Sequence, residues 1–106
     1  MRVQVHVEGQ ISYGRMAEFT AAVREYIAYA AEHGYVTPQV LQGMSGPMNT
    51  VRLVYCYDDL SGYERHEARS SADREYGRLA SAMPFQEGSI SYHIFAESPV
   101  SGVMSE

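Results

Sequence analysis

The side chains best suited to chemistry in this sequence are three histidines, His6, His66 and His93, together with Arg52 and Tyr63. A neutral histidine near pH 7 can take a proton from a phenol or an enol, and an arginine can stabilise the enolate that results. An electron-rich phenolate can then react with oxygen directly or cyclise, so this chemistry needs no cofactor. We therefore interpret the histidines and Arg52 as candidate catalytic residues that cluster with Tyr63. The alternative is structural, with His6 and His93 hydrogen-bonded across a sheet and His66 solvated on a helix.

Two segments near the ends of the chain predict neighbouring strands that bring several of these residues together. Residues 2–8 and 89–96 both alternate between apolar and polar side chains, the pattern of a half-buried strand. If their apolar positions share one face, the other face collects polar side chains, and a strand over residues 51–57 adds to it. The members of this polar set are Gln4, His6, Arg52, Cys56, Ser91 and His93.

A sheet face with this many polar groups is too polar for a dry core. It therefore either meets water in a dimer interface or lines a pocket. In a pocket, we expect the side chains that contact the substrate to be Gln4, Tyr55, Tyr63 and Ser91.

Two helical regions follow from the spacing of apolar residues. Residues 14–33 carry apolar side chains at helical spacing and predict one long helix. The second region begins near Ser61, which with Glu64 fits a capping box, and it breaks at residues 70–71. Asp73 is then placed to cap a further helical segment.

Residues 37–45 and 51–57 predict the remaining strands, so that one domain over residues 1–97 has the order β-α-β-β-α-β, with a tail at 98–106. Right-handed crossovers then predict an α+β, ferredoxin-like fold. Its antiparallel sheet has four strands in the order 4-1-3-2, and its two helices lie on one face. Segment 51–57 is apolar on both of its faces, so something must cover the second one. We predict a homodimer packed sheet to sheet; the alternative is a monomer with a weakly apolar open face.

A series of short motifs accompanies the second helical region. A strand ends in an acidic run, an aromatic residue stands on the first helical turn, and an acidic and aromatic run marks the break. These motifs are Asp58-Asp59-Leu60, Tyr63-Glu64 and Ser71-Ala72-Asp73-Arg74-Glu75-Tyr76 with Leu79. The pattern resembles the dimeric α+β barrel superfamily over residues 1–97, and within it NIPSNAP-type domains and the antibiotic-biosynthesis monooxygenase group.

The resemblance implies a pocket between the sheet and the helices of each subunit, with Tyr63 and His66 near it. The superfamily includes cofactor-independent monooxygenases that act on aromatic polyketides, haem-degrading monooxygenases, lactone isomerases and polyketide cyclases. It also includes many members without an assigned activity, so the resemblance implies the fold more specifically than the chemistry.

The composition narrows the classes of partner. The chain has 106 residues and a net charge of -5, which disfavours nucleic acid and anionic membranes as partners. All eight basic residues are arginines, so no lysine is present to form a Schiff base. The single cysteine, Cys56, fits a reducing compartment, and the sequence shows neither a signal peptide nor a membrane-spanning run. We predict a cytoplasmic protein.

The sequence favours neither a metal nor a haem. No pair among the histidines and Cys56 has the spacing of a metal site. Haem binding through His66 would resemble the haem-degrading branch, but that branch also relies on tryptophan, and this chain has none. We predict no cofactor.

Three functions fit these features. The first is a cofactor-free monooxygenase, cyclase or isomerase that acts on a small aromatic or polyketide-like molecule. The second is a module that binds such a molecule without chemistry, and the third is a structural or partner-binding homodimer. The first two predict an enclosed cavity that touches His6 or His93, and the third predicts none. The chain has nine tyrosines, and tyrosine suits partly solvated surfaces such as the walls of ligand pockets. The alternative is that tyrosine is frequent here because it favours strands.

Overall fold

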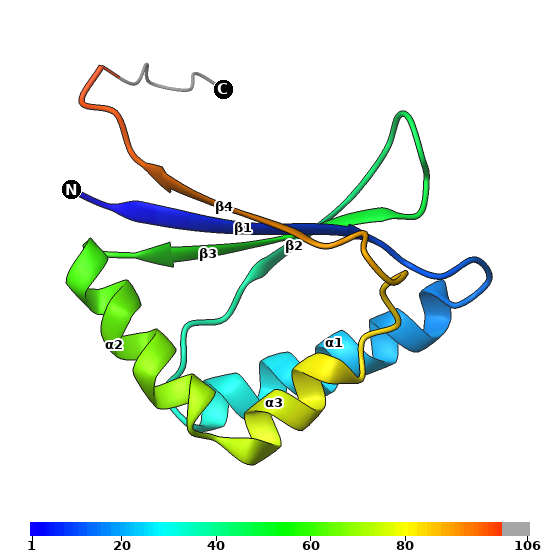
Figure 1. Cartoon of the computed structure of the whole chain (residues 1–106), viewed down its shortest axis with the longest axis horizontal. Coiled ribbons are helices and arrows are strands. Elements are labelled where there is room, and N and C mark those ends of the chain that lie inside the picture. The colour runs from blue at the N-terminus through cyan, green and yellow to red at the C-terminus, as the bar shows by residue number, and fades with distance from the viewer. Residues whose placement is uncertain (101–106) are drawn as a thin grey trace.

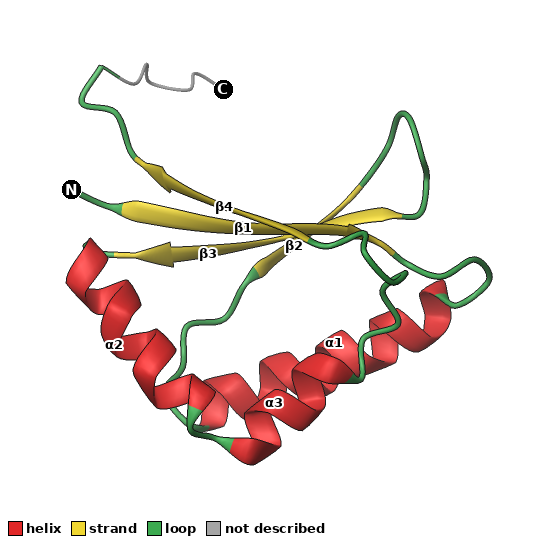
Figure 2. Ribbon diagram, viewed as in Figure 1, coloured by secondary structure: helices red, strands yellow, loops and turns green. Residues whose placement is uncertain are grey.

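The fold is a single antiparallel sheet with helices on one side (Figures 1 and 2). The computed structural model describes residues 1–100. Within them the chain runs through β1 (Val3–Gln10), α1 (Met16–Glu32), β2 (Gln39–Gln42), β3 (Thr50–Tyr57), α2 (Leu60–Ser71), α3 (Arg74–Ser81) and β4 (Ser91–Ala96). The strands lie in the order β2-β3-β1-β4, which is the predicted order read from the other edge. The ferredoxin-like α+β prediction is confirmed.

The two central strands pair in a register that sorts their side chains by face. Val5 lies opposite Tyr55 of β3 and Ile94 of β4, while His6 lies opposite Val54 and His93. Because opposed residues in an antiparallel pair share a face, the apolar positions of β1 gather on one side of the sheet. That side is the one covered by the helices, and its core includes Val3, Val5, Val7, Val51, Leu53, Tyr55 and Tyr57.

Helix α1 packs against the helix side of the sheet and covers this core. Phe19, Val23, Tyr26 and Ala30 are its buried residues, and their three- and four-residue spacing places them on one stripe. The predicted stripe over residues 14–33 therefore corresponds to the face that packs against the sheet. The division into a domain over residues 1–97 and a tail stays a prediction, and residues 101–106 of the predicted tail lie outside the described residues.

The predicted break in the second helical region separates α2 from α3. Asp73 caps α3, and its carboxylate accepts a hydrogen bond from the backbone N–H of Tyr76 at 3.1 Å. The same carboxylate accepts hydrogen bonds from the hydroxyls of Tyr29, at 2.9 Å, and Tyr35, at 2.7 Å. These hydrogen bonds hold the pKa of Asp73 below its usual range, and the bond from the backbone of Tyr76 has the largest effect on it. Asp73 therefore ties the start of α3 to Tyr29 at the end of α1.

The predicted cap of α2 was wrong by two residues. The N-cap is Asp59, whose carboxylate accepts a hydrogen bond from the backbone N–H of Gly62 at 2.7 Å. Ser61 already lies inside the helix. The backbone of Asp59 is extended, as an N-cap requires, and a short acidic side chain caps as well as serine does.

Within residues 1–100, no helix has the length and apolar character needed to span a membrane.

Replacing Asp73 should destabilise the fold through the junction of α2 and α3. Asp73→Ala removes the cap of α3 and the acceptor for Tyr29 and Tyr35. The loss of a helix cap alone typically lowers the melting temperature of a domain of this size by about 4–8 °C. Thermal unfolding followed by circular dichroism measures the shift, and Asp58→Ala, at an exposed acidic position, is the matched control. Equal melting temperatures for the two variants would contradict this role of Asp73.

Candidate ligand-binding site

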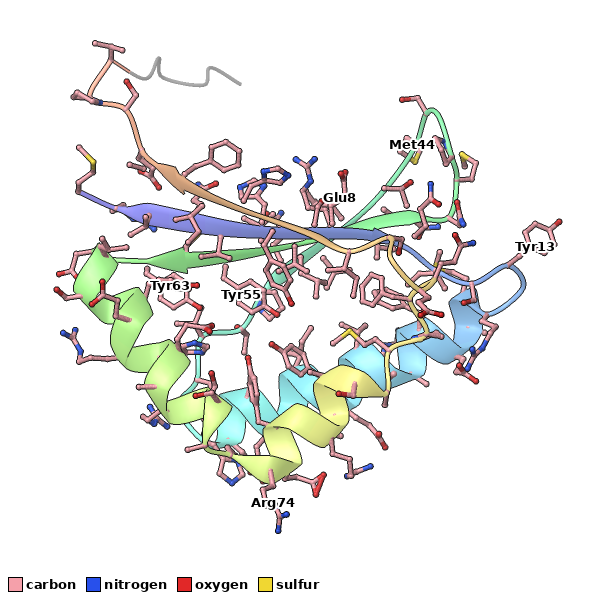
Figure 3. The ribbon with its side chains drawn as sticks, viewed as in Figure 1. Glu8, Tyr13, Met44, Tyr55, Tyr63 and Arg74 are labelled. Atoms are coloured by element: carbon pink, nitrogen blue, oxygen red, sulfur yellow. The ribbon has the colours of Figure 1, made fainter. Side chains whose placement is uncertain are left out.

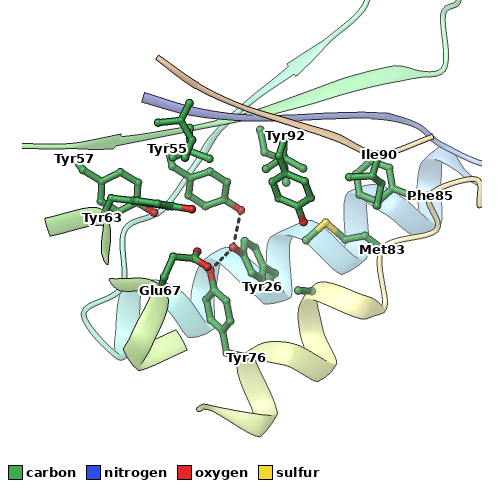
Figure 4. Close-up of a pocket in the computed structure, with 15 residues that line it drawn as sticks. Tyr26, Tyr55, Tyr57, Tyr63, Glu67, Tyr76, Met83, Phe85, Ile90 and Tyr92 are labelled. Carbon is green, nitrogen blue, oxygen red and sulfur yellow. Dashed lines mark hydrogen bonds between the residues drawn. The ribbon is translucent and has the colours of Figure 1, made fainter. Parts of the chain in front are cut away.

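A cavity of about 390 Å³ lies between the sheet and the helices (Figure 4). This volume is within the range of about 300–1,000 Å³ that is typical of small-molecule sites. Apolar side chains from the sheet, from α3 and from the connection between α3 and β4 form much of the wall, and phenol rings form most of the rest. The lining tyrosines are Tyr26, Tyr55, Tyr57, Tyr63, Tyr76 and Tyr92.

Each element brings its tyrosines to the cavity for a local reason. The alternation of β3 places Tyr55 and Tyr57 on the helix side, and the buried stripe of α1 does the same for Tyr26. Tyr76 stands on the first turn of α3, where the cap at Asp73 sets the direction of the helix. The site therefore depends on the break between α2 and α3.

Three of the phenol hydroxyls form a hydrogen-bonded chain inside the cavity wall. The hydroxyl oxygen of Tyr26 lies 2.6 Å from that of Tyr55 and 2.5 Å from that of Tyr76 (Figure 4). Burial is the main cause that raises the pKa of all three phenols well above the usual value for tyrosine. All three are therefore neutral hydrogen-bonding groups at physiological pH.

Among residues 1–100, Glu67 is the only residue with a carboxylate that lines the cavity, and no arginine or histidine of this range joins it there. Burial is the largest cause that raises the pKa of Tyr57, Tyr63 and Tyr76, and the negative charge of Glu67 raises it further. The cavity thus has phenol donors, one anion and no cation in its wall. In chemical terms it can donate hydrogen bonds to a ligand and accept a proton at Glu67.

His66 lies behind the cavity wall, packed against the rings of Tyr35, Tyr57 and Tyr76. Its Nδ1 is 3.2 Å from the hydroxyl oxygen of Tyr57, and its Nε2 is buried without a hydrogen-bond partner among residues 1–100. Burial, aided by the charge of Arg69 and opposed by that of Glu67, lowers the pKa of His66. The imidazole is therefore neutral near pH 7, and its one hydrogen bond to a cavity residue among residues 1–100 is that with Tyr57.

The predicted single cluster of His6, His66, His93, Arg52 and Tyr63 was wrong. His6, His93 and Arg52 lie on the face of the sheet opposite to the helices, whereas Tyr63 lies at the cavity and His66 behind its wall. Figure 3 shows the separation, with Glu8, the cross-strand partner of Arg52, on one side of the sheet and Tyr55 and Tyr63 on the other.

The reason for this separation is the period-2 alternation itself. The polar set of β1 and β4 occupies the face that the apolar set leaves free, and the helices cover the apolar set. The expected contact of a cavity with His6 or His93 therefore does not occur at this cavity. Of the expected substrate contacts, Tyr55 and Tyr63 line the cavity, and Gln4 and Ser91 lie on the opposite face.

On the open face, the polar side chains bond to one another. Arg52 donates a hydrogen bond to Glu8 at 2.9 Å, and Nε2 of His6 is 2.9 Å from the amide oxygen of Gln4. Burial, then the charges of Arg52 and His93, lower the pKa of His6. The bond of His6 is to a residue of its own strand, not across the sheet as the structural alternative expected, and its Nδ1 is buried without a hydrogen-bond partner among residues 1–100. Within residues 1–100, no three histidine, cysteine, aspartate or glutamate side chains gather in a way that could hold a metal ion.

Five of the polar residues that line the cavity were not among the predicted site residues, namely Tyr26, Tyr57, Glu67, Tyr76 and Tyr92. The strand parity that places Tyr55 on the apolar side also places Tyr57 there, so this residue could have been found. Tyr26 lies on the predicted apolar stripe of the helix, and that position predicts a core residue rather than a site residue. Tyr76 and Glu67 depend on how α2 and α3 turn at the break, which no sequence spacing specifies.

The family model for NIPSNAP matches residues 10–93 of this chain. The chain belongs to the NIPSNAP family. The match includes most of the cavity wall, from Tyr26 of α1 to Tyr92 of β4, but not Val5 and Val7 of β1. Among curated proteins, none matches the chain.

Solved structures share the fold of this NIPSNAP chain at low sequence identity. A NIPSNAP family protein from Agrobacterium tumefaciens is 18% identical, with a TM-score of 0.77 over 94% of this chain and 89% of that one. An uncharacterised NIPSNAP domain protein from Burkholderia xenovorans is 19% identical, with a TM-score of 0.74 over 97% and 100%. A putative antibiotic biosynthesis monooxygenase from Caulobacter crescentus is 12% identical, with a TM-score of 0.72 over 92% and 90%. The predicted likeness to both groups is confirmed at the level of fold.

The buried His66 should make the NIPSNAP domain sensitive to acid. Its pKa is lowered on folding, so the unfolded chain binds a proton that the folded chain resists. The free energy of unfolding should fall as the pH drops from about 6.5, the ordinary histidine value, through the lower pKa of the folded state. His66→Gln should show a smaller fall than the wild type between pH 7.5 and 5.5 in urea unfolding.

The matched control is His33→Gln, at an exposed position after α1. This variant should keep the pH dependence of the wild type. If His66→Gln also keeps it, His66 is not the group responsible.

Proposed function

We propose that this protein binds a small aromatic or polyketide-like molecule in the tyrosine-lined cavity and acts on it without a cofactor. The observation that supports the proposal best is the wall of the cavity itself. Six phenol rings and apolar side chains from the sheet and α3 form a site of ligand size, with a single charged group. Flat aromatic walls suit a flat apolar ligand, and the hydroxyls provide directional contacts.

The proposed chemistry is that of a monooxygenase, cyclase or isomerase, and it requires a group that takes a proton. Glu67 is the candidate, because its carboxylate lines the cavity and the neighbouring phenols stay protonated. His6, His93 and Arg52 are on the opposite face and do not enter this proposal. The Caulobacter protein, a putative antibiotic biosynthesis monooxygenase, lends support by its similar fold alone.

The second candidate is a module that binds the same ligand without transforming it. The observation that favours it is the shortage of proton-transfer groups at the cavity, since His66 stands behind Tyr57 and the phenols are hard to ionise. Both candidates predict ligand binding in the cavity, so binding is the first step to test.

Filling the cavity should weaken ligand binding while the fold remains. Ala80 lines the cavity from α3, and Ala80→Leu places extra methyl groups in the ligand space. The probe is N-phenyl-1-naphthylamine, a neutral aromatic whose fluorescence rises in an apolar site. We expect Ala80→Leu to weaken its binding at least about tenfold, because the overlap removes the site rather than one contact.

Ala68→Leu, at an exposed position of α2, is the matched control and should bind the probe as the wild type does. Circular dichroism of both variants checks the fold. If the probe binds the wild type and Ala80→Leu equally, the ligand site is not this cavity.

We also propose that the protein forms a homodimer through the open face of the sheet. On this face Val54 is buried within the single chain, whereas Leu41 on β2 and Phe95 on β4 present apolar surface, with 43% and 52% of their surface exposed. The charged pair of Arg52 and Glu8 is bonded within the face, so its burial leaves no unpaired charge. A second copy of the same face is the simplest cover, and the single free cysteine suits the reducing cytoplasm in which we place the dimer.

A charge on the open face should separate the dimer. Phe95 lies opposite Gln4 on this face, and Phe95→Asp would bury an unpaired carboxylate in the interface. Light scattering after size exclusion should give about twice the chain mass of 11.8 kDa for the wild type and a single chain mass for the variant. Tyr13→Asp replaces an exposed side chain in a loop, and this control variant should remain dimeric. A wild-type mass of one chain at micromolar concentration would rule the dimer out.

A further inference from the structure

The three phenols in the cavity wall have one more hydroxyl proton than the hydrogen bonds among them require. Tyr26, Tyr55 and Tyr76 have three hydroxyl protons, and they make two hydrogen bonds with one another. A hydroxyl donates once and can accept twice, so two bonds use two protons in every arrangement of the chain. One O–H therefore always remains available to donate.

Residues 1–100 provide these three hydroxyls with no further hydrogen-bond partner beyond the two bonds within the chain. All three residues line the cavity, so the remaining proton belongs to the cavity wall. An O–H without an acceptor in the protein can donate to an oxygen that enters the cavity, so a ligand that presents such an oxygen gains a hydrogen bond there.

The charges around the cavity decide what kind of oxygen this is. No cation is among the lining residues, and the one charged group, Glu67, is an anion. A ligand carboxylate or phenolate would lose its water and meet a like charge. The tyrosines, themselves phenols, show the same effect, since burial and the charge of Glu67 raise the pKa of Tyr57 and Tyr76.

We propose that the cavity selects compact apolar molecules whose oxygen is a neutral acceptor, such as the carbonyl of an aromatic ketone, quinone or lactone, and that the Tyr55–Tyr26–Tyr76 chain donates to this oxygen. This inference rests on the proposed function, because it names the ligand class of the same cavity. It excludes organic acids of the same size.

The surroundings strengthen the donor. Hydrogen bonds in a chain polarise one another, so the last O–H of the chain is a better donor than an isolated phenol. Tyr63 also lines the cavity as a neutral phenol, with a pKa raised by burial and then by Glu67. The cavity is therefore rich in donors and poor in acceptors, with Glu67 as the exception.

Three probes of nearly equal shape test the selectivity: 2-acetylnaphthalene, 2-ethylnaphthalene and 2-naphthoate. Dissociation constants are measured by calorimetry at pH 7.5. We expect the ketone to bind about fivefold more tightly than the hydrocarbon, the value of one typical hydrogen bond. The naphthoate should bind more weakly than either.

The carbonyl stretch of bound ¹³C-labelled 2-acetylnaphthalene tests the donor itself. A hydrogen bond moves this infrared band to lower frequency. The three hydroxyls of the chain are removed separately with Tyr26→Phe, Tyr55→Phe and Tyr76→Phe, and at least one variant should return the band towards its position in an apolar solvent. The same variant should reduce the affinity for the ketone to that for the hydrocarbon. Tyr13→Phe, at a position 95% exposed, is the matched control and should change neither measurement.

The outcomes separate the two proposals. If none of the three probes binds, the proposed function fails and this inference fails with it. If the hydrocarbon binds as tightly as the ketone, or the naphthoate binds most tightly, the cavity binds ligands but the selectivity proposed here is wrong. If the carbonyl band keeps its wild-type position in all three variants, the phenol chain is not the donor.

Discussion

The antiparallel pairing of β1 with β3 decides which side chains of this protein can meet. With Val5 opposite Tyr55 and His6 opposite Val54, every second residue of both strands is committed to the helix side. A slip of one residue would exchange the two faces entirely. The tyrosine-lined cavity and the polar open face are therefore two results of one register.

On the helix side, this register brings phenols rather than purely aliphatic groups into the core, and their hydroxyls must find partners. The chain of Tyr26, Tyr55 and Tyr76 joins α1, β3 and α3, and Asp73 accepts bonds from Tyr29 and Tyr35. Burial and then the bond to Asp73 raise the pKa of Tyr29 to about 12. The fold thus uses hydroxyl bonds to fix the relative positions of its helices, and the same bonds shape the cavity.

Much of the fold could be predicted from the sequence, because alternation and helical spacing are local signals. The alternation of residues 2–8, the stripe of residues 14–33 and the cap at Asp73 each predicted an element that the structure contains. The site was harder, because its residues come from different elements. Tyr26 and Tyr55 are 29 residues apart and share a bond only because β3 packs over α1. His6 and His93 were correctly predicted to share a face, but that face is the one the helices leave open.

The placement of charge limits the chemistry of the cavity more than its shape does. An enolate or phenolate intermediate needs a cation or several strong donors close by, and Arg52, the predicted source of positive charge, lies on the other side of the sheet and bonds to Glu8. Within the cavity, only neutral phenols remain to stabilise an oxygen that gains negative charge. A proton taken by Glu67 would remove that residue's own negative charge at the moment when charge develops on the ligand. The cavity would then carry a single negative charge throughout the proton transfer. This is the arrangement in which a cavity without a cation can support enolisation, because the negative charge moves from a carboxylate to an oxygen held by phenols.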